Sequence, residues 1–119
     1  MVRYPEDYDK IKSGCDLIVA LDIGVSTRGG IWIVKAENTP IINMDHHIDN
    51  DKFGMINIVE AGYSSTCELV YDFFTTNNIE ISKSMAISLY TGIVYDTGSF
   101  RHSCTTKQTH EFVGQMVSK

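Results

Sequence analysis

The sequence predicts an α/β fold built in three layers, α/β/α, around a mostly parallel sheet. Residues 16–22 and 40–45 are short, continuously apolar runs that each end in aspartate, which is typical of parallel strands covered on both faces. Segments with helical spacing follow these runs along the chain. Strands that alternate with helices form parallel sheets, whose ligands bind at the carboxyl ends of the strands. The two aspartates are therefore the first candidates for a functional site.

Three strands are predicted in the first half of the chain. Residues 16–22 predict a central strand, and residues 40–45 predict a second strand that runs directly into an Asp-His-His triplet. Between them, residues 31–34 are apolar and predict either a short strand or a turn of helix. Residues 55–59 alternate enough to predict a third strand.

Three amphipathic helices are predicted in the second half. Ser65, with Glu68 three residues later, forms a capping-box pattern at the start of the first helix, which ends at an Asn-Asn pair. The second helix covers residues 82–94, and its wide apolar stripe predicts packing deep against the sheet. The third begins at about Thr106, an expected N-cap. The apolar positions are Cys67, Val70, Tyr71 and Phe74, then Ala86, Ile87, Leu89, Tyr90, Ile93 and Val94, then Phe112, Val113, Met116 and Val117.

Composition narrows the class of protein. The 119 residues are enough for one domain, and no repeat or linker divides them. The formal charge of −5 argues against a broad basic face for long nucleic acids. We expect no membrane span and no secretory signal, and therefore a cytoplasmic protein. The three widely spaced cysteines predict neither a disulfide framework nor a zinc site.

The polar residues at the strand ends form a candidate metal site. Asp45, His46 and His47 follow the second strand, and Asp22 and Asp96 end other apolar elements. Carboxylates with imidazoles suit Mn²⁺ or Mg²⁺ better than a metal that prefers thiolates. Successive side chains leaving a strand point in different directions, so we expect one histidine to bind metal and the other to face substrate. The alternative is that the triplet only caps a loop.

Four motifs in register make the chain resemble the DHH phosphoesterase family. They are D-H-H at 45–47, N-x-x-F-G-x-I-N at 50–57, S-S-T-x-E at 64–68 and L-Y-x-G-I-x-x-D-T-G-S-F at 89–100. Within the family, the chain is most similar to the NrnA-type branch of oligoribonucleases and 3′-phosphoadenosine 5′-phosphate phosphatases, which is related to RecJ. The similarity spans most of the chain from about residue 16.

The resemblance implies a role for each matching residue. Asp22 resembles the carboxylate that bridges two metal ions, and His46 and Asp96 resemble ligands of one of them. His47 resembles the histidine that meets the scissile phosphate and assists the leaving oxygen, and Asp45 resembles the residue that orients a histidine ring. Arg28 is an expected electrostatic support, with a solvated surface arginine as the alternative. Substrate phosphate is expected to contact Ser64, Ser65 and Thr66 at a helix N-terminus, although capping explains Ser65 equally well.

The sequence departs from the family pattern at both ends. No counterpart of the family's first metal motif, His-x-x-x-Asp-x-Asp, lies before residue 16, and we expect the C-terminal substrate-binding domain of the family to be missing as well. We therefore interpret residues 1–119 as a single partial DHH domain. A sheet that lacks a strand exposes backbone donors and apolar surface. The chain is therefore expected to form homodimers, to self-associate in another way or to be only marginally stable.

These observations leave two hypotheses for what the protein does, one catalytic and one non-catalytic. The first is an enzyme that uses two Mn²⁺ (or Mg²⁺) ions to activate water and hydrolyse short oligoribonucleotides or 3′-phosphoadenosine 5′-phosphate. Inorganic pyrophosphatase or polyphosphatase activity is the nearest alternative with the same chemistry. The second is a catalytically inactive fragment or module that binds a metal ion or a nucleotide. The absence of any Ser-His-Asp, Cys-His or P-loop pattern agrees with metal-activated water.

Overall fold

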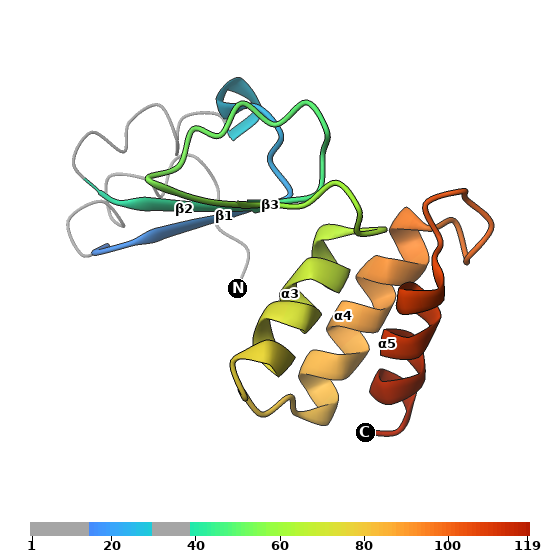
Figure 1. Cartoon of the computed structure of the whole chain (residues 1–119). Coiled ribbons are helices and arrows are strands. Elements are labelled where there is room, and N and C mark those ends of the chain that lie inside the picture. Colours follow the sequence, from blue (N-terminus) through green and yellow to red (C-terminus); the bar gives the residue numbers. More distant parts are fainter. Residues whose placement is uncertain (1–14, 30–38) are drawn as a thin grey trace. The chain divides into compact units, whose positions relative to one another are not determined.

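The computed structural model describes residues 15–29 and 39–119, which form two compact units (Figure 1). The first unit ends at Val59 and the second begins at Glu60. The first unit contains a parallel sheet and the second contains three helices, so the predicted α/β class is confirmed. The predicted strand or helix turn at residues 31–34 lies outside the described residues.

The sheet of the first unit has three parallel strands in the order β1-β2-β3. These strands are β1 (Ile18–Leu21), β2 (Ile41–Asp45) and β3 (Ile56–Val59). All three were predicted, β1 and β2 from their apolar runs and β3 from its alternating pattern. The register pairs Ile18 with Ile41 and Asp45 with Val59. Since β2 lies in the middle, the Asp-His-His triplet leaves the central strand of the described sheet.

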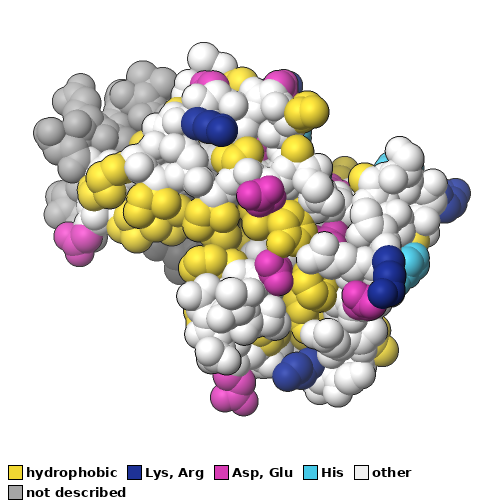
Figure 2. Space-filling view, viewed as in Figure 1, with side chains coloured by type: hydrophobic (Ala, Val, Ile, Leu, Met, Phe, Trp, Pro, Cys, Tyr) yellow, Lys and Arg dark blue, Asp and Glu magenta, His cyan; other side chains and the backbone are white. Residues whose placement is uncertain are grey.

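The prediction that residues 16–22 form a central strand is wrong for the described sheet. β1 pairs only with β2 there, and Val19 and Leu21 are 50% and 48% exposed. Figure 2 shows hydrophobic side chains gathered along the sheet. A continuous apolar run shows that a strand contains few polar residues, but it does not show how many other strands pair with it.

The second unit is built from α3 (Thr66–Thr76), α4 (Lys83–Asp96) and α5 (Lys107–Val117). α4 packs against both other helices, and its predicted wide stripe is wrong at Ile87, which is 58% exposed. The stripe is narrower because neighbouring helices, rather than a flat sheet, cover α4 within this unit. No helix among the described residues is long and apolar enough to cross a membrane. The hydrophobic core of this second unit comprises Tyr71, Ile81, Ala86, Ile93 and Met116.

The N-caps follow the sequence closely, with one difference. Ser65 accepts a hydrogen bond from the Glu68 amide, and Thr106 forms a full capping box with Thr109. The capping box predicted at Ser65 is only half formed. The Glu68 carboxylate instead accepts hydrogen bonds from the backbone amide and the hydroxyl of Ser64.

Glu68 is a buried carboxylate that joins two helices. It is 1% exposed, and its Oε2 atom also accepts a hydrogen bond of 3.1 Å from the Thr109 hydroxyl at the start of α5. Three donors therefore converge on one oxygen. Their convergence at the first turn of α3, where the helix dipole favours negative charge, offsets the cost of burying the group.

We expect Glu68→Ala to destabilise the chain by about 2–4 kcal/mol, because it leaves the Ser64 and Thr109 donors unpaired beside a cavity. Urea denaturation followed by circular dichroism measures this loss. Glu111→Ala is the matched control. Glu111 is an exposed glutamate on α5 whose ion pair with Lys107 is 3.2 Å long, and exposed pairs contribute about 0–1 kcal/mol. Equal stabilities of the two variants would show that the buried network contributes nothing.

Candidate metal centre

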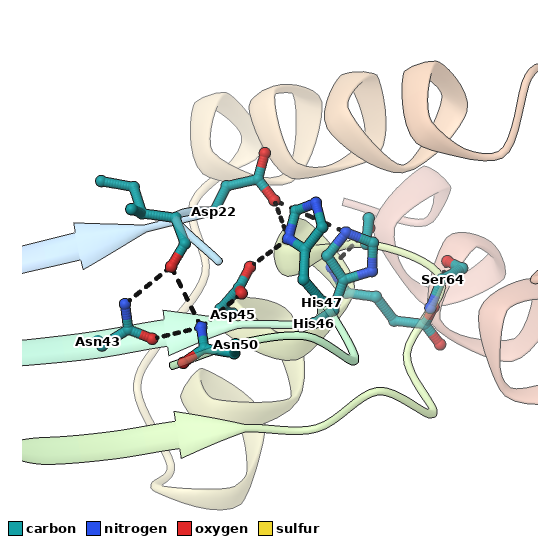
Figure 3. Close-up of polar contacts among 10 residues, drawn as sticks. Asp22, Asn43, Asp45, His46, His47, Asn50 and Ser64 are labelled. Atoms are coloured by element: carbon teal, nitrogen blue, oxygen red, sulfur yellow. Dashed lines mark hydrogen bonds and ion pairs between the residues drawn. The ribbon is translucent and has the colours of Figure 1, made fainter. Parts of the chain in front are cut away.

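The ends of β1 and β2 bring the predicted site residues together. The backbone amide of Asp22 donates a hydrogen bond of 3.1 Å to the carbonyl of Met44, so pairing continues to the end of β1. Asp22 then adopts a left-handed conformation, with φ of 62°, which aspartate tolerates better than most residues. The chain turns there, and the carboxylate lies beside the histidines of the triplet (Figure 3).

Both histidines face this carboxylate. Asp22 Oδ1 lies 3.6 Å from His46 Nε2 and 3.9 Å from His47 Nδ1, and the ring centroids are 4.8 Å apart. The prediction that the two side chains leave in different directions is therefore wrong. β2 ends at Asp45, so the alternation of a strand no longer applies to the two residues that follow it.

Asp45 holds the ring of His47. The carboxylate of Asp45 is fully buried, and its Oδ1 atom lies 2.7 Å from His47 Nδ1. Burial pushes the pKa of Asp45 upward, but the hydrogen bonds with His47 and Asn50 outweigh burial and lower it. Asp45 therefore remains ionised and keeps a proton on Nδ1 of His47. This is the contact that an orienting role for Asp45 requires.

An asparagine network that the sequence did not predict supports Asp45. The side-chain nitrogen of Asn50 lies 2.6 Å from Asp45 Oδ2 and 3.0 Å from Asn43 Oδ1. Asn43 is fully buried, and both asparagines donate to the carbonyl of Ile23, next to Asp22. The network thereby joins the turn after β1 to the end of β2. Asn50 opens the motif at 50–57, which was the only indication of it in the sequence.

Gly54 and Asn57, later in the same motif, are closely packed. A Cβ atom on Gly54 would lie 2.6 Å from the carbonyl oxygen of Ile56 and 2.9 Å from the amide nitrogen of Asn43, so only glycine fits. The side chain of Asn57 accepts from the amide of Gly54 and donates to its carbonyl. These contacts explain why the motif combines asparagine with glycine at fixed spacing.

The other predicted site residues lie after β1, at the end of α4 and around the start of α3. Arg28 is exposed in the short 3₁₀ helix η2 (Ser26–Gly29) after β1. Asp96 is the last residue of α4, in the second unit. Ser64, Ser65 and Thr66 are buried in that unit. Since the Ser64 hydroxyl donates to Glu68 and Ser65 caps α3, capping accounts for Ser65, and phosphate binding by these three residues stays a prediction.

The contacts of His47 predict a raised pKa. The hydrogen bond with Asp45 raises the pKa of His47 above its ordinary value of 6.5, burial opposes the shift, and the charges of Asp45, Asp22 and Asp49 add to it. We expect NMR titration to give a value above 6.5, and Asp45→Asn to lower it. Asp49→Asn, which removes the same charge without a hydrogen bond, should lower it less. Equal effects of the two variants would contradict the role of the hydrogen bond.

The same shifts set a pH window for stability. The pKa of His47 is raised on folding, so its contribution is complete below pH 6.5 and is lost as pH rises through the raised value. The pKa of Asp45 is lowered on folding, so its contribution is present above pH 3.8 and is lost as pH falls through the lowered value. Both contributions are therefore present between pH 3.8 and 6.5.

The donor atoms fit a divalent cation. One ligand atom from each of Asp22, His46 and His47 lies within 4.8 Å of the other two. Metal bonds of about 2.1 Å place two ligands up to about 4.2 Å apart across one ion, a span that includes both contacts of Asp22. Since Nδ1 of His47 is engaged by Asp45, His46 is the better-placed nitrogen ligand.

Comparison with known proteins gives a consistent result. The model of the DHH family, N-terminal domain, matches residues 2–93. The chain is 31% identical over 115 residues, 97% of its length, to the bifunctional oligoribonuclease and PAP phosphatase NrnA of Thermus thermophilus, and covers 34% of that relative. It is 35% identical over 77 residues, 65% of its length, to a probable bifunctional oligoribonuclease and PAP phosphatase NrnA of Streptococcus mutans, and covers 25% of it.

A solved structure gives the same picture. An exopolyphosphatase-related protein from Bacteroides fragilis superimposes with a TM-score of 0.87 at 32% sequence identity. The match covers 98% of this chain and 36% of that one. The chain thus spans about a third of the length of this structure and of the Thermus relative.

Proposed function

The chain belongs to the DHH family, and from that premise we propose that it serves the Mn²⁺-dependent hydrolysis of short oligoribonucleotides or of 3′-phosphoadenosine 5′-phosphate. Phosphoester hydrolysis is the chemistry of the family. The observation that carries the finer proposal is the cluster of Asp22, His46 and His47 at the ends of two parallel strands. The names of the Thermus and Streptococcus relatives supply the substrate class.

Metal binding in this proposal is divided among three residues. Asp22 and His46 hold the ions, and Asp96 joins them as the family resemblance implies. When bound, divalent ions supply a water of lowered pKa and neutralise charge on the phosphoryl group. The protein then needs no covalent nucleophile, which agrees with the lack of a Ser-His-Asp or Cys-His pattern in the sequence.

His47 handles a proton in this proposal. Asp45 keeps Nδ1 protonated, which leaves Nε2 to carry the proton that titrates. Because the pKa of His47 is raised, the ring holds that proton at pH values where an isolated imidazole has lost it. A protonated Nε2 is suited to donate to the leaving oxygen of the scissile phosphate as the bond breaks.

Inorganic polyphosphate is a second candidate substrate. The Bacteroides structure bears the name of an exopolyphosphatase-related protein, and the same donor set suits hydrolysis of inorganic polyphosphate. The alternative to an enzyme is a module that binds a metal ion or a nucleotide without turning over any substrate.

The experiment measures hydrolysis with Mn²⁺ and with chelator. The substrates are a 5′-phosphorylated diribonucleotide, 3′-phosphoadenosine 5′-phosphate and tripolyphosphate, and Asp96→Ala controls for a contaminating nuclease. We expect Mn²⁺-dependent release of nucleotide or phosphate from the first two substrates, lost in Asp96→Ala. Faster release from tripolyphosphate would move the assignment to polyphosphate. Mn²⁺ binding without turnover of any substrate would support the binding module.

A further inference from the structure

The loop that follows α4 has an unusual backbone. Gly98, Ser99 and Phe100 all have positive φ, at 55°, 60° and 65°. Three consecutive left-handed residues are rare, and two of these carry side chains that disfavour the conformation. Figure 1 shows the loop between α4 and α5. Strain of this kind persists where surrounding contacts impose it, and it often accompanies a functional site.

Thr97 supplies most of the contacts that impose this conformation. It is fully buried, its hydroxyl donates to the carbonyl of Ile93, and the same hydroxyl accepts from the amide of Phe100. Its carbonyl accepts from the amides of Arg101 and His102. Phe100 packs against the helical core. The loop is therefore a fixed structure that starts immediately after Asp96.

Arg101 is held at the surface by this loop. Its Nε atom donates a hydrogen bond of 2.9 Å to the carbonyl of Gly98, and its side chain is exposed. No carboxylate among the described residues forms an ion pair with it, and residues 97–105 contain no acidic residue. The next residue, His102, places its Nδ1 atom 3.0 Å from the carbonyl oxygen of Asp96. A positive group without an acidic partner is thus anchored to the loop that directly follows Asp96, an expected metal ligand at the end of α4.

We infer that Arg101 binds a non-bridging phosphate oxygen of the substrate. This inference rests on the proposed function and adds a residue to it. The anchored Nε fixes the plane of the guanidinium and leaves its terminal nitrogens as a fork for two phosphate oxygens. In a chain of net charge −5, a substrate with several negative charges needs such local positive groups. The ligand class is a phosphate monoester dianion, such as the terminal phosphate of a short oligonucleotide.

The kinetic test compares Arg101→Gln and Arg101→Lys with Lys107→Gln, which removes one positive charge from a 90% exposed side chain. With 5′-phosphorylated diribonucleotide, Arg101→Gln should raise KM about tenfold or more, since a hydrogen bond to a charged group is lost. We expect kcat to change by less than about threefold, because uniform binding is lost rather than transition-state binding. The lysine variant should recover part of the loss, and Lys107→Gln should match the wild type.

A second arm does not depend on activity. Inorganic phosphate is titrated into the metal-free protein in chelator, and the Nε–H signal of Arg101, identified by its absence from Arg101→Gln, is followed by NMR. We expect a saturable shift with phosphate and none with chloride at equal ionic strength. Turnover with unchanged KM in Arg101→Gln would overturn the inference and leave the proposed function intact. A saturable shift without turnover of any substrate would keep the inference and reject the proposed function. No shift and no KM effect would reject Arg101 as a phosphate ligand.

Discussion

Asp22→Ala should lower the affinity of the chain for Mn²⁺ by more than about 100-fold, since even residues that only support metal ligands account for about 10–100-fold. Asp22 is the carboxylate of the three-residue cluster, and its Oδ1 atom is the one that approaches both histidine rings. Without it, His46 is the remaining ligand of this cluster, and an imidazole alone suits Mn²⁺ poorly. Isothermal titration calorimetry or the electron paramagnetic resonance signal of free Mn²⁺ measures the change.

The matched control for this prediction is Asp16→Ala. Asp16 is an exposed aspartate just before the other end of β1, so the two variants change net charge equally. A second readout is stability, because a ligand at 100 times its Kd stabilises the folded state by about 2.7 kcal/mol. Mn²⁺ should stabilise the wild type and Asp16→Ala but not Asp22→Ala. Equal Mn²⁺ affinity in the two variants would remove Asp22 from the metal site.

The sequence predicted those features of the fold that depend on local pattern. The apolar runs located β1 and β2, and parallel pairing then required their carboxyl ends to meet, which brought Asp22 to the histidines. The caps Ser65 and Thr106 could be predicted for the same reason, because a cap and its partner lie three residues apart. Ser82 was predicted only as the start of its helix.

Features that depend on distant contacts could not be predicted. Asn50 contacts the carbonyl of Ile23 across 27 residues, and Glu68 contacts Thr109 across 41. Nothing in the local pattern distinguishes these side chains from solvated ones. The direction of the two histidines failed for a related reason, since it depended on where β2 ends rather than on the alternation within it. The roles of Asp96 and Arg28 rest on the family resemblance and stay predictions.

Asn50→Asp should destabilise the first unit by about 3–5 kcal/mol, the usual effect of leaving a buried charge uncompensated. Asparagine and aspartate have nearly the same shape, so packing is unchanged. The variant replaces the donor nitrogen 2.6 Å from Asp45 Oδ2 with an oxygen, which sets two carboxylates in contact and removes the donors to Asn43 and Ile23. Hydrogen exchange of the β2 amides with increasing urea reports the stability of this unit.

Asn50→Ala separates charge from packing. It removes the same hydrogen bonds and leaves a small cavity, which should cost about 2 kcal/mol, less than the isosteric aspartate. The pH dependence differs as well. Repulsion between the carboxylates of Asn50→Asp raises their folded pKa values above the unfolded ones, so the variant regains stability as pH falls through the raised values. Asn50→Ala has no such recovery. If aspartate costs no more than alanine at neutral pH, Asn50 serves the site through its shape rather than by donating hydrogen bonds to a charged Asp45.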